Sequence, residues 1–373
     1  MMKSLSGMDY GIDVPRFPPA RLVKLTDCIK NFLVKTARRM GPSNLAVFEL
    51  TQNIWIIRAI GVAVELEIAD ILSGGPKTVS ELAVLTKSNP DNLYRLMRAL
   101  ASQGIFRETG NRTFRMTPLA SGLKEGKGSM KNMIAHQLNP TNWQMIGEMT
   151  YCVRTGKDVA EKILGSDIFE YLKKYPEKNR LYNLAMTDTS NISSATVLSA
   201  YNFSGVKKLV DIGGGHGFLL SIIMHKYPEL QGVIFDLPHV VKGANETIKK
   251  MGIENRVSIV PGNFFETVPE GGDTYILKSI IHAFDDEKCI SLLQNIYKAM
   301  VDKGKLLIVE VVLPEDNSPS FGKIFDLQML IGAPGGKERT RKEFEYILSR
   351  SGFKLKRIIP TVSPFCILES LKL

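Results

Sequence analysis

The sequence predicts an α/β protein with a doubly wound C-terminal domain and a mostly helical N-terminal part. Three observations carry this prediction. Residues 209–217 have the pattern of a strand that runs into a glycine-rich turn, and apolar residues at helical spacing follow from Phe218. Further predicted strands then alternate with helices as far as Leu373. Upstream, residues 76–119 have the pattern of two short helices and a β-hairpin, which is typical of a winged helix.

The spacing of the glycines in this turn distinguishes between two classes of nucleotide-like ligand. Glycines stand at positions 213, 214, 215 and 217, and Asp211 lies at the end of the strand before them. A dinucleotide fingerprint, Gly-x-Gly-x-x-Gly counted from Gly213, would need a glycine where Phe218 stands. A carboxylate here would repel a pyrophosphate, but it suits a ligand with an ammonium group and no phosphate. The turn, with Asp211, Gly213 and Gly215, therefore predicts S-adenosylmethionine at a helix N-terminus, and a purely structural turn is the alternative.

Two strand ends farther along the chain extend this candidate site. Asp236 ends the next predicted strand, about 20 residues beyond the turn, where a carboxylate accepts hydrogen bonds from both ribose hydroxyls. Leu237 follows it directly and belongs to the same candidate site. The third strand, at 257–260, leads into Asn263 and Phe264, an amide and an aromatic ring suited to the edge and the face of adenine.

The fourth strand leads to two side chains that could bind a ligand or take part in a reaction. Residues 274–277 form this predicted strand, and Lys278 and then His282 follow it. The carboxyl ends of parallel strands meet at one edge of an open sheet, which is where such folds bind their ligands. Four strand ends in this order predict one site in a Rossmann-like domain.

Composition limits the classes of protein that the chain can represent. Its 373 residues, 44% hydrophobic and 23% charged, are typical of a globular protein with more than one core. The N-terminus lacks the apolar segment of a secretory signal, and no apolar stretch approaches the roughly 20 residues that span a bilayer. The four cysteines lie far apart, which argues against structural zinc and disulfides and favours the cytoplasm. The net charge of +10 has two interpretations, an acidic partner or a solvated basic surface. We prefer the solvated surface, because no run of Lys and Arg exceeds two residues.

We expect four segments along the chain. They are an N-terminal extension with an amphipathic helix (1–44), a winged-helix-like dimerisation domain (45–125), a helical linker and substrate-pocket region (126–200), and a Rossmann-like catalytic domain (201–373).

The winged helix has two interpretations. In a DNA-binding regulator its second helix would enter the major groove, and that helix carries Arg95 and Arg98. In many enzymes the same module only dimerises. We favour dimerisation, because a regulator would not need the downstream ligand site. The long apolar helical stretch at 45–72 has more hydrophobic side chain than one small domain covers, which predicts a homodimer. We expect neither a nucleic-acid partner nor a membrane span.

The region before the first strand of the Rossmann-like domain offers candidate walls for a flat apolar substrate. Its pattern predicts helices that carry aromatic residues and methionine at helical spacing, which is also common in ordinary cores. We take four of these side chains as candidates for binding an aromatic acceptor: Trp143, Phe169, Tyr182 and Met186.

Together with a C-terminal Pro-Gly-Gly-Lys-Glu-Arg-Thr segment at 334–340, these motifs resemble the small-molecule O-methyltransferases. The likeness is to the caffeic-acid and hydroxyindole type and to bacterial relatives in antibiotic pathways, over residues 45–373. The resemblance implies a winged-helix-containing dimerisation domain followed by a Rossmann-like class I methyltransferase domain. It implies S-adenosylmethionine as donor, no metal, and an aromatic acceptor between the domains.

The resemblance also implies roles for individual residues. Lys278 contacts the donor, His282 is the general base, and Glu310 and Glu338 flank and orient it. The chemistry agrees with this assignment, because a phenol with a pKa near 10 is a poor nucleophile at neutral pH and a histidine can accept its proton. A neighbouring carboxylate fixes the imidazole tautomer and stabilises the imidazolium.

The chain departs from the family pattern at several positions. Ala283 and Phe284 replace the usual Asp-Trp after the histidine, Asn263 replaces an aspartate, and Ala333 replaces an asparagine before the Pro-Gly-Gly segment. The losses at 283 and 333 remove polar groups near the acceptor, and so bear on substrate identity more than on reaction type. A relative that uses the donor site for hydroxylation, decarboxylation or cyclisation is the enzymatic alternative.

Overall fold

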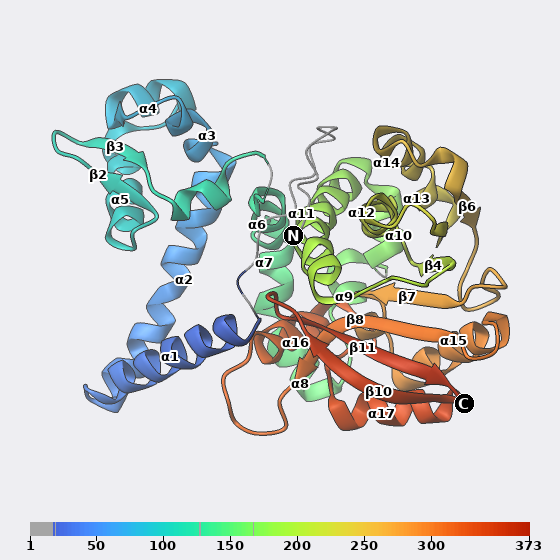
Figure 1. The fold of residues 1–373 in the computed structure, drawn as a ribbon. Helices are drawn as coiled ribbons and strands as arrows, with labels where there is room; N and C mark the ends of the chain where they lie inside the picture. The colour runs from blue at the N-terminus through green and yellow to red at the C-terminus, as the bar shows by residue number, and fades with distance from the viewer. Residues whose placement is uncertain (1–17, 19, 127, 167) are drawn as a thin grey trace. The chain divides into compact units, whose positions relative to one another are not determined.

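A computed structural model describes residue 18 and residues 20–126, 128–166 and 168–373 (Figure 1). Residues 1–17, on which the expectation of no secretory signal depends, lie outside the described part. The chain divides into two compact units, which are considered separately. The first is formed chiefly by Thr150–Ala160 and Ser190–Leu373, and the second by Asp27–Met149 and Glu161–Thr189.

The first unit is built on a mixed sheet in the order β10-β11-β8-β7-β4-β5-β6. Strands β4 to β8 pair in parallel, and the chain runs outward from β4 in one direction and from β7 in the other. The switch point therefore lies between β4 and β7, where open α/β sheets bind ligands. The strands are β4 (Lys208–Ile212), β5 (Gln231–Asp236), β6 (Val257–Pro261), β7 (Thr274–Lys278), β8 (Lys305–Leu313), β10 (Phe353–Pro360) and β11 (Phe365–Lys372), with β9 (Arg339–Thr340) paired to the end of β8.

The C-terminus differs from the expected alternation of strands and helices. Strands β10 and β11 form an antiparallel hairpin, and β11 also runs antiparallel to β8 (Figure 1). A short segment, residues 361–364, joins the two strands without a helix. The expectation of alternation as far as Leu373 is therefore wrong for the last two strands, because a hairpin needs only a short turn whereas a parallel crossover needs a longer connection.

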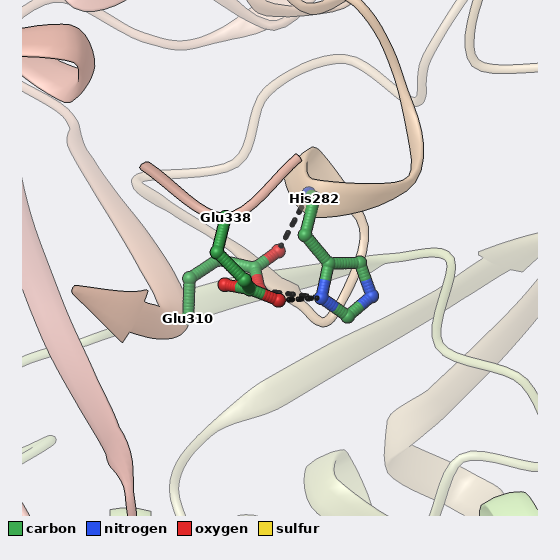
Figure 2. A group of neighbouring side chains, drawn as sticks. All are labelled: His282, Glu310 and Glu338. Carbon is green, nitrogen blue, oxygen red and sulfur yellow. Dashed lines mark hydrogen bonds and ion pairs between the residues drawn. The ribbon is translucent and has the colours of Figure 1, made fainter. Parts of the chain in front are cut away.

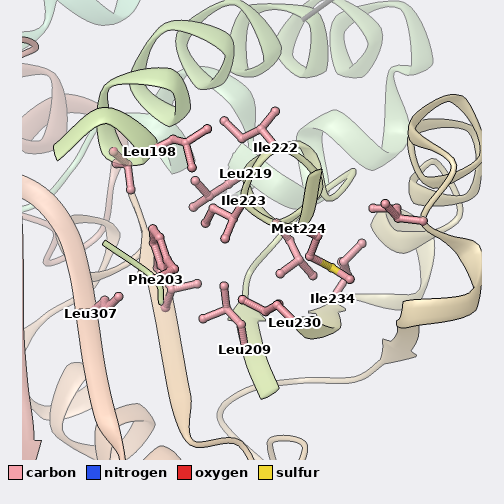
Figure 3. Packing of buried hydrophobic residues seen from close by; sticks show 14 of the residues in the cluster. Leu198, Phe203, Leu209, Leu219, Ile222, Ile223, Met224, Leu230, Ile234 and Leu307 are labelled. Atoms are coloured by element: carbon pink, nitrogen blue, oxygen red, sulfur yellow. The ribbon is translucent and has the colours of Figure 1, made fainter. Parts of the chain in front are cut away.

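Hydrophobic cores cover both faces of this sheet. On one face, Leu209 of β4 and Ile234 of β5 pack against helix α12 (Phe218–Lys226), as Figure 3 shows. On the other, alternate strand residues such as Val210 and Leu277 pack with α15 and α17. The helices of this unit are α8 (Met149–Thr155), α13 (Pro238–Val241), α14 (Ala244–Met251), α15 (Asp286–Ala299), α16 (Phe321–Gly332) and α17 (Arg341–Arg350), with short 3-10 turns η2 (Glu254–Arg256) and η3 (Ile281–Ala283).

The second unit contains the predicted winged helix. Its sheet has the order β1-β3-β2, and β2 and β3 form the expected hairpin. Thr78 caps α4 through a capping box with Glu81, and the Asn89 side chain accepts from two backbone N–H groups at the start of α5. The elements are α3 (Ile68–Ser73), β1 (Lys77–Thr78), α4 (Val79–Thr86), α5 (Pro90–Ser102), β2 (Phe106–Glu108), β3 (Thr113–Met116) and η1 (Leu119–Leu123).

Further helices complete the chain: α1 (Ala20–Arg39), α2 (Ser43–Glu65), α6 (Lys131–Gln137), α7 (Pro140–Gly147), α9 (Ala160–Leu164), α10 (Ile168–Lys174) and α11 (Pro176–Ala200). The expectation that no apolar stretch approaches the length of a membrane span is wrong for helix α2, which is long and apolar enough by length and composition. Little of its apolar window is buried, and Phe48 and Trp55 are 61% and 70% exposed. All four cysteines lie in the described part of the chain, and none of them forms a disulfide there.

Candidate active site

The glycine-rich turn adopts a conformation that depends on its glycines. Gly213, Gly215 and Gly217 all have positive φ angles, of 68°, 57° and 76°. A Cβ atom on Gly217 would lie 2.2 Å from Cδ1 of Ile234, and one on Gly213 would lie 2.4 Å from Cδ1 of Ile280. The turn therefore packs tightly on β5 and on the residues after β7, and α12 starts directly behind it at Phe218.

Asp236 holds the turn through its carboxylate. Oδ2 accepts the backbone N–H of Gly215 at 2.9 Å, and Oδ1 accepts that of Leu237 at 2.7 Å. Burial raises the pKa of Asp236, and the two N–H donors oppose that rise. Leu237 caps α13 and is 38% exposed. An acid fixed in this way retains lone pairs for a ligand hydroxyl.

Asp211 lies beneath the turn and is 2% exposed. Its Oδ2 is a buried oxygen without a hydrogen-bond partner among the described residues. Burial raises its pKa to about 7, while the charge of Lys278 opposes the increase. An unpartnered buried carboxylate oxygen is a suitable place for the cationic part of a ligand, so the residues present fit S-adenosylmethionine.

The residues expected at the adenine are partly committed to their own loop. Asn263 Oδ1 accepts the N–H of Phe265 at 3.1 Å, and its Nδ2 donates to Glu266 at 3.0 Å. One lone pair of the amide oxygen is left for a ligand donor. Phe264 packs edge-on against Phe265 and lies 3.9 Å from the position of a Cβ on Gly213, so it borders the glycine-rich turn.

Lys278, at the end of β7, links two parts of the site. Its Nζ donates to Oγ of Ser190 on α11 at 2.8 Å. Burial lowers the pKa of Lys278, and the charges of Asp211 and Glu310 oppose this. Ser190 was not singled out from the sequence, because a serine within a helix carries no local signal of function.

Three of the predicted residues meet at the ends of β7 and β8. His282 Nδ1 lies 2.9 Å from Oε1 of Glu338 and 3.4 Å from Oε2 of Glu310 (Figure 2). Both glutamate side chains are fully buried. Burial alone would lower the pKa of His282, but the two carboxylates outweigh it and raise that pKa above 6.5. The other ring nitrogen points away from both carboxylates in Figure 2.

Glu310 is held by the backbone of the turn that carries the histidine. Its Oε1 accepts N–H groups of Ile280 at 2.9 Å and of Ile281 at 2.8 Å. Burial raises the pKa of Glu310, and Oε2 has no hydrogen-bond partner among the described side chains and backbone. Glu310 therefore fixes the turn with one oxygen and presents the other to the imidazole.

Two residues near His282 were missed from the sequence. Asp326 on α16 accepts the backbone N–H of Glu338 at 2.7 Å and so holds the loop that carries this acid. The ring of Phe325, on the same helix, has its centroid 5.7 Å from that of His282. Both residues lie more than forty positions from His282 in the sequence, so no local pattern predicts either contact.

The four residues proposed for the acceptor walls belong to the second unit. Trp143 lies on α7, and its buried Nε1 has no hydrogen-bond partner among the described residues; Phe169 lies on α10, and Tyr182 and Met186 lie on α11. Tyr182 packs edge-on against His136, with ring centroids 5.4 Å apart. Their role toward an acceptor stays a prediction.

The histidine and the two acids could also hold a metal ion. One ligand atom from each of His282, Glu310 and Glu338 lies within 4.8 Å of the others. Two carboxylates and an imidazole suit several divalent metals. The expectation that no metal takes part therefore needs a direct test.

Comparison with known proteins identifies the family. A profile of the O-methyltransferase domain matches residues 146–354, and one of the O-methyltransferase dimerisation domain matches residues 48–125. A phenazine O-methyltransferase, PhzM, from Lysobacter antibioticus is 38% identical over 329 residues, which is 88% of this chain and 96% of that protein. The chain belongs to the S-adenosylmethionine-dependent O-methyltransferases.

Solved structures agree with this assignment for the O-methyltransferase. The crystal structure of LaPhzM aligns with a TM-score of 0.83 at 38% identity, and covers 89% of this chain and 100% of that one. CalO1, a methyltransferase in calicheamicin biosynthesis solved with S-adenosylhomocysteine bound, aligns with a TM-score of 0.80 at 28% identity, over 89% of this chain and 98% of that one. The predicted family, enzyme class and fold class are confirmed, and the winged helix lies within the dimerisation match.

Proposed function

We propose that this enzyme transfers a methyl group from S-adenosylmethionine to a phenolic hydroxyl of a flat aromatic molecule, with His282 as general base. The observation that carries the proposal is the contact of His282 Nδ1 with Glu338 at 2.9 Å beside the buried Glu310. When Nδ1 donates its proton to Glu338, the opposite nitrogen, Nε2, is left with a lone pair that can accept the proton of a phenol. The imidazolium that forms is stabilised by both carboxylates.

The donor site is assigned to the glycine-rich turn and the strand ends around it. S-Adenosylmethionine, when bound, supplies a methyl group on a cationic sulfur that leaves readily. Asp236 would bind the ribose, Asn263 and Phe264 the adenine, and Asp211 and Lys278 the charged methionine part. The protein then has to align the acceptor oxygen with the methyl carbon, which is chiefly a matter of position.

The acceptor is inferred from two sources. Within the first unit the ring of Phe325 lies beside His282, and the sequence-predicted candidates Trp143, Phe169, Tyr182 and Met186 belong to helices of the second unit. The relative from Lysobacter antibioticus is named for a phenazine, a flat aromatic system. A planar phenol of two or three fused rings is the acceptor class that we would screen first.

We infer that the enzyme works as a homodimer through its N-terminal helices. Leu22, Leu25, Ile29, Phe32 and Leu33 recur on one side of α1, and each is more than half exposed. This stripe continues into the exposed apolar residues of α2, inside the dimerisation match. Exposed apolar surface of this extent is typical of a subunit interface. A second copy of the chain, and neither nucleic acid nor a membrane, is the partner that we propose.

Introduction of negative charge into the apolar stripe of α1 tests the dimer. Ile29→Glu with Phe32→Glu should shift the sedimentation equilibrium toward monomer, whereas Asn31→Glu with Lys35→Glu on the opposite face should leave it unchanged. Equal dimer affinity in both variants, or retention of the wild-type chain on anionic vesicles or duplex DNA at physiological salt, would contradict this assignment.

Replacement of the base tests the reaction. His282→Ala should lower kcat by roughly 10²–10⁴-fold and leave the affinity for S-adenosylhomocysteine nearly unchanged, because a positioned base contributes to the chemical step and not to donor binding. His225→Ala, at the exposed end of α12, is the matched control. Labelled methyl transfer to a panel of phenols gives the rate. Donor binding without transfer to any phenol in the wild-type enzyme would favour the non-methylating alternative.

A further inference from the structure

Two loops meet at the proposed base. One contains His282 in η3 and continues into α15, whose first turn holds Asp286. The other, residues 334–339, carries Glu338. A Cβ atom on Gly336 would lie 2.7 Å from the carbonyl oxygen of His282, so the second loop packs directly on the backbone of the first. The Pro-Gly-Gly part of the sequence motif therefore allows the two loops to pack closely against each other.

One buried guanidinium joins these loops. Arg339 is 0% exposed, and all five of its N–H donors are used. Nε and Nη2 donate to Oδ1 of Asp286 at 2.9 and 2.7 Å, and Nη2 also donates to the carbonyl of Phe284 at 2.8 Å. Nη1 donates to the carbonyls of Ile281 at 2.8 Å and of Lys337 at 3.3 Å.

The positions of these acceptors matter more than their number. The carbonyls of Ile281 and Phe284 stand before and after His282, so Arg339 fixes the turn of the base on both sides. Arg339 is also the residue next to Glu338 in the chain. A planar, forked guanidinium can reach a carboxylate and two carbonyls at once, whereas the single ammonium group of a lysine cannot.

We propose that Arg339, paired with Asp286, is a positioning residue that sets the contact between Glu338 and His282 during methyl transfer. The proposal deepens the function proposed above and depends on His282 as the base. Arg339 does not touch the reacting atoms. It acts through the two loops that carry the base and the acid that orients it.

The electrostatics give this role a measurable signature. His282 faces Glu310 from β8, Glu338 from the second loop and Lys278 from β7. The two carboxylates raise the pKa of His282, so a loosened Glu338 should let that pKa fall. The rising limb of the kcat profile would then move to lower pH, which a general loss of stability would not produce.

Two variants and one control test the proposal. In Arg339→Lys and in Asp286→Asn, kcat for a phenolic acceptor should fall by about 10- to 100-fold and the midpoint of the rising limb should move down by about 0.5 to 1 pH unit. Asp286 is partly exposed, so its variant should fold even if Arg339→Lys does not. Arg256→Lys is the matched control, because Arg256 also donates to backbone carbonyls, of Met224, Tyr227 and Leu230, but lies away from the base.

The outcomes are distinguishable. Lower kcat and a lower midpoint in the two variants, with both quantities unchanged in Arg256→Lys, would support the positioning role. Wild-type kcat in Asp286→Asn, or a reduced kcat with an unmoved midpoint, would overturn it. Wild-type kcat in His282→Ala would instead show that the proposed base is wrong, whatever Arg339 does.

Discussion

Alanine at Gly217 should destabilise the enzyme by a predictable amount. Gly217 has a φ of 76°, and the left-handed conformation costs an alanine about 1–2 kcal/mol. Its Cβ would also lie 2.2 Å from Cδ1 of the fully buried Ile234, and overpacking of this kind costs about 1–3 kcal/mol. We therefore expect Gly217→Ala to lower the free energy of unfolding by about 2–5 kcal/mol.

The neighbouring Gly215 separates the two contributions. Its φ of 57° imposes the same conformational strain, but no atom of the described residues lies within 4 Å of a Cβ at this position. Gly215→Ala should therefore cost only about 1–2 kcal/mol. Urea denaturation followed by circular dichroism gives the unfolding free energies, and titration with S-adenosylhomocysteine gives the effect on the donor site.

A double-mutant cycle tests the steric part directly. Ile234→Val removes Cδ1 and by itself should cost about 0.5–1.5 kcal/mol. Combined with Gly217→Ala it should restore part of the lost stability, because the clashing atom is gone. Equal destabilisation by Gly215→Ala and Gly217→Ala, together with additive effects in the cycle, would refute the claim that Ile234 limits the size of residue 217.

Four further outcomes are expected. Asp236→Ala should weaken S-adenosylhomocysteine binding by about 1.5–3 kcal/mol in calorimetry, since it removes a charged acceptor and releases Gly215. Glu338→Gln should lower kcat by less than His282→Ala does while donor affinity is unchanged, as measured by labelled methyl transfer. The kcat/KM profile should rise with pH and reach half its plateau above pH 6.5, because the base must be neutral and its pKa is raised; Glu310→Gln should move that midpoint to lower pH. Prolonged dialysis against a chelator should leave kcat unchanged, and recovery of a lost rate by a divalent metal would show that the cluster at His282 is a metal site.

The donor site was predictable because its signals are local. A strand pattern, four closely spaced glycines and an acid two residues before the first of them occupy nine consecutive positions, so a local pattern predicts the turn. Asp236, Lys278 and His282 follow from the rule that parallel strands end at one edge. The capped helices of the winged helix were predictable for the same reason, since Thr78 with Glu81 and Asn89 are short-range signals.

Contacts that join distant segments could not be derived from local patterns. Glu338 lies 56 residues from His282, and only a family motif placed it near the base. Asp326 and Ser190 lie within helices, and nothing in the sequence marks either of them as part of the site. The C-terminal hairpin was missed because apolar strand patterns do not show the direction of pairing, although the short segment between β10 and β11 leaves no room for a crossover helix.

The buried charges of the first unit favour a cationic ligand. Asp211, Glu310 and Glu338 are at most 3% exposed, and each has one buried oxygen without a partner among the described residues. Lys278 is the cation that interacts with both Asp211 and Glu310, and burial lowers its pKa. Buried carboxylates with unused lone pairs are costly unless a positive charge or a proton reaches them. A sulfonium and an ammonium group at the donor turn, and a proton at the imidazole during transfer, would supply that charge at both ends of the site.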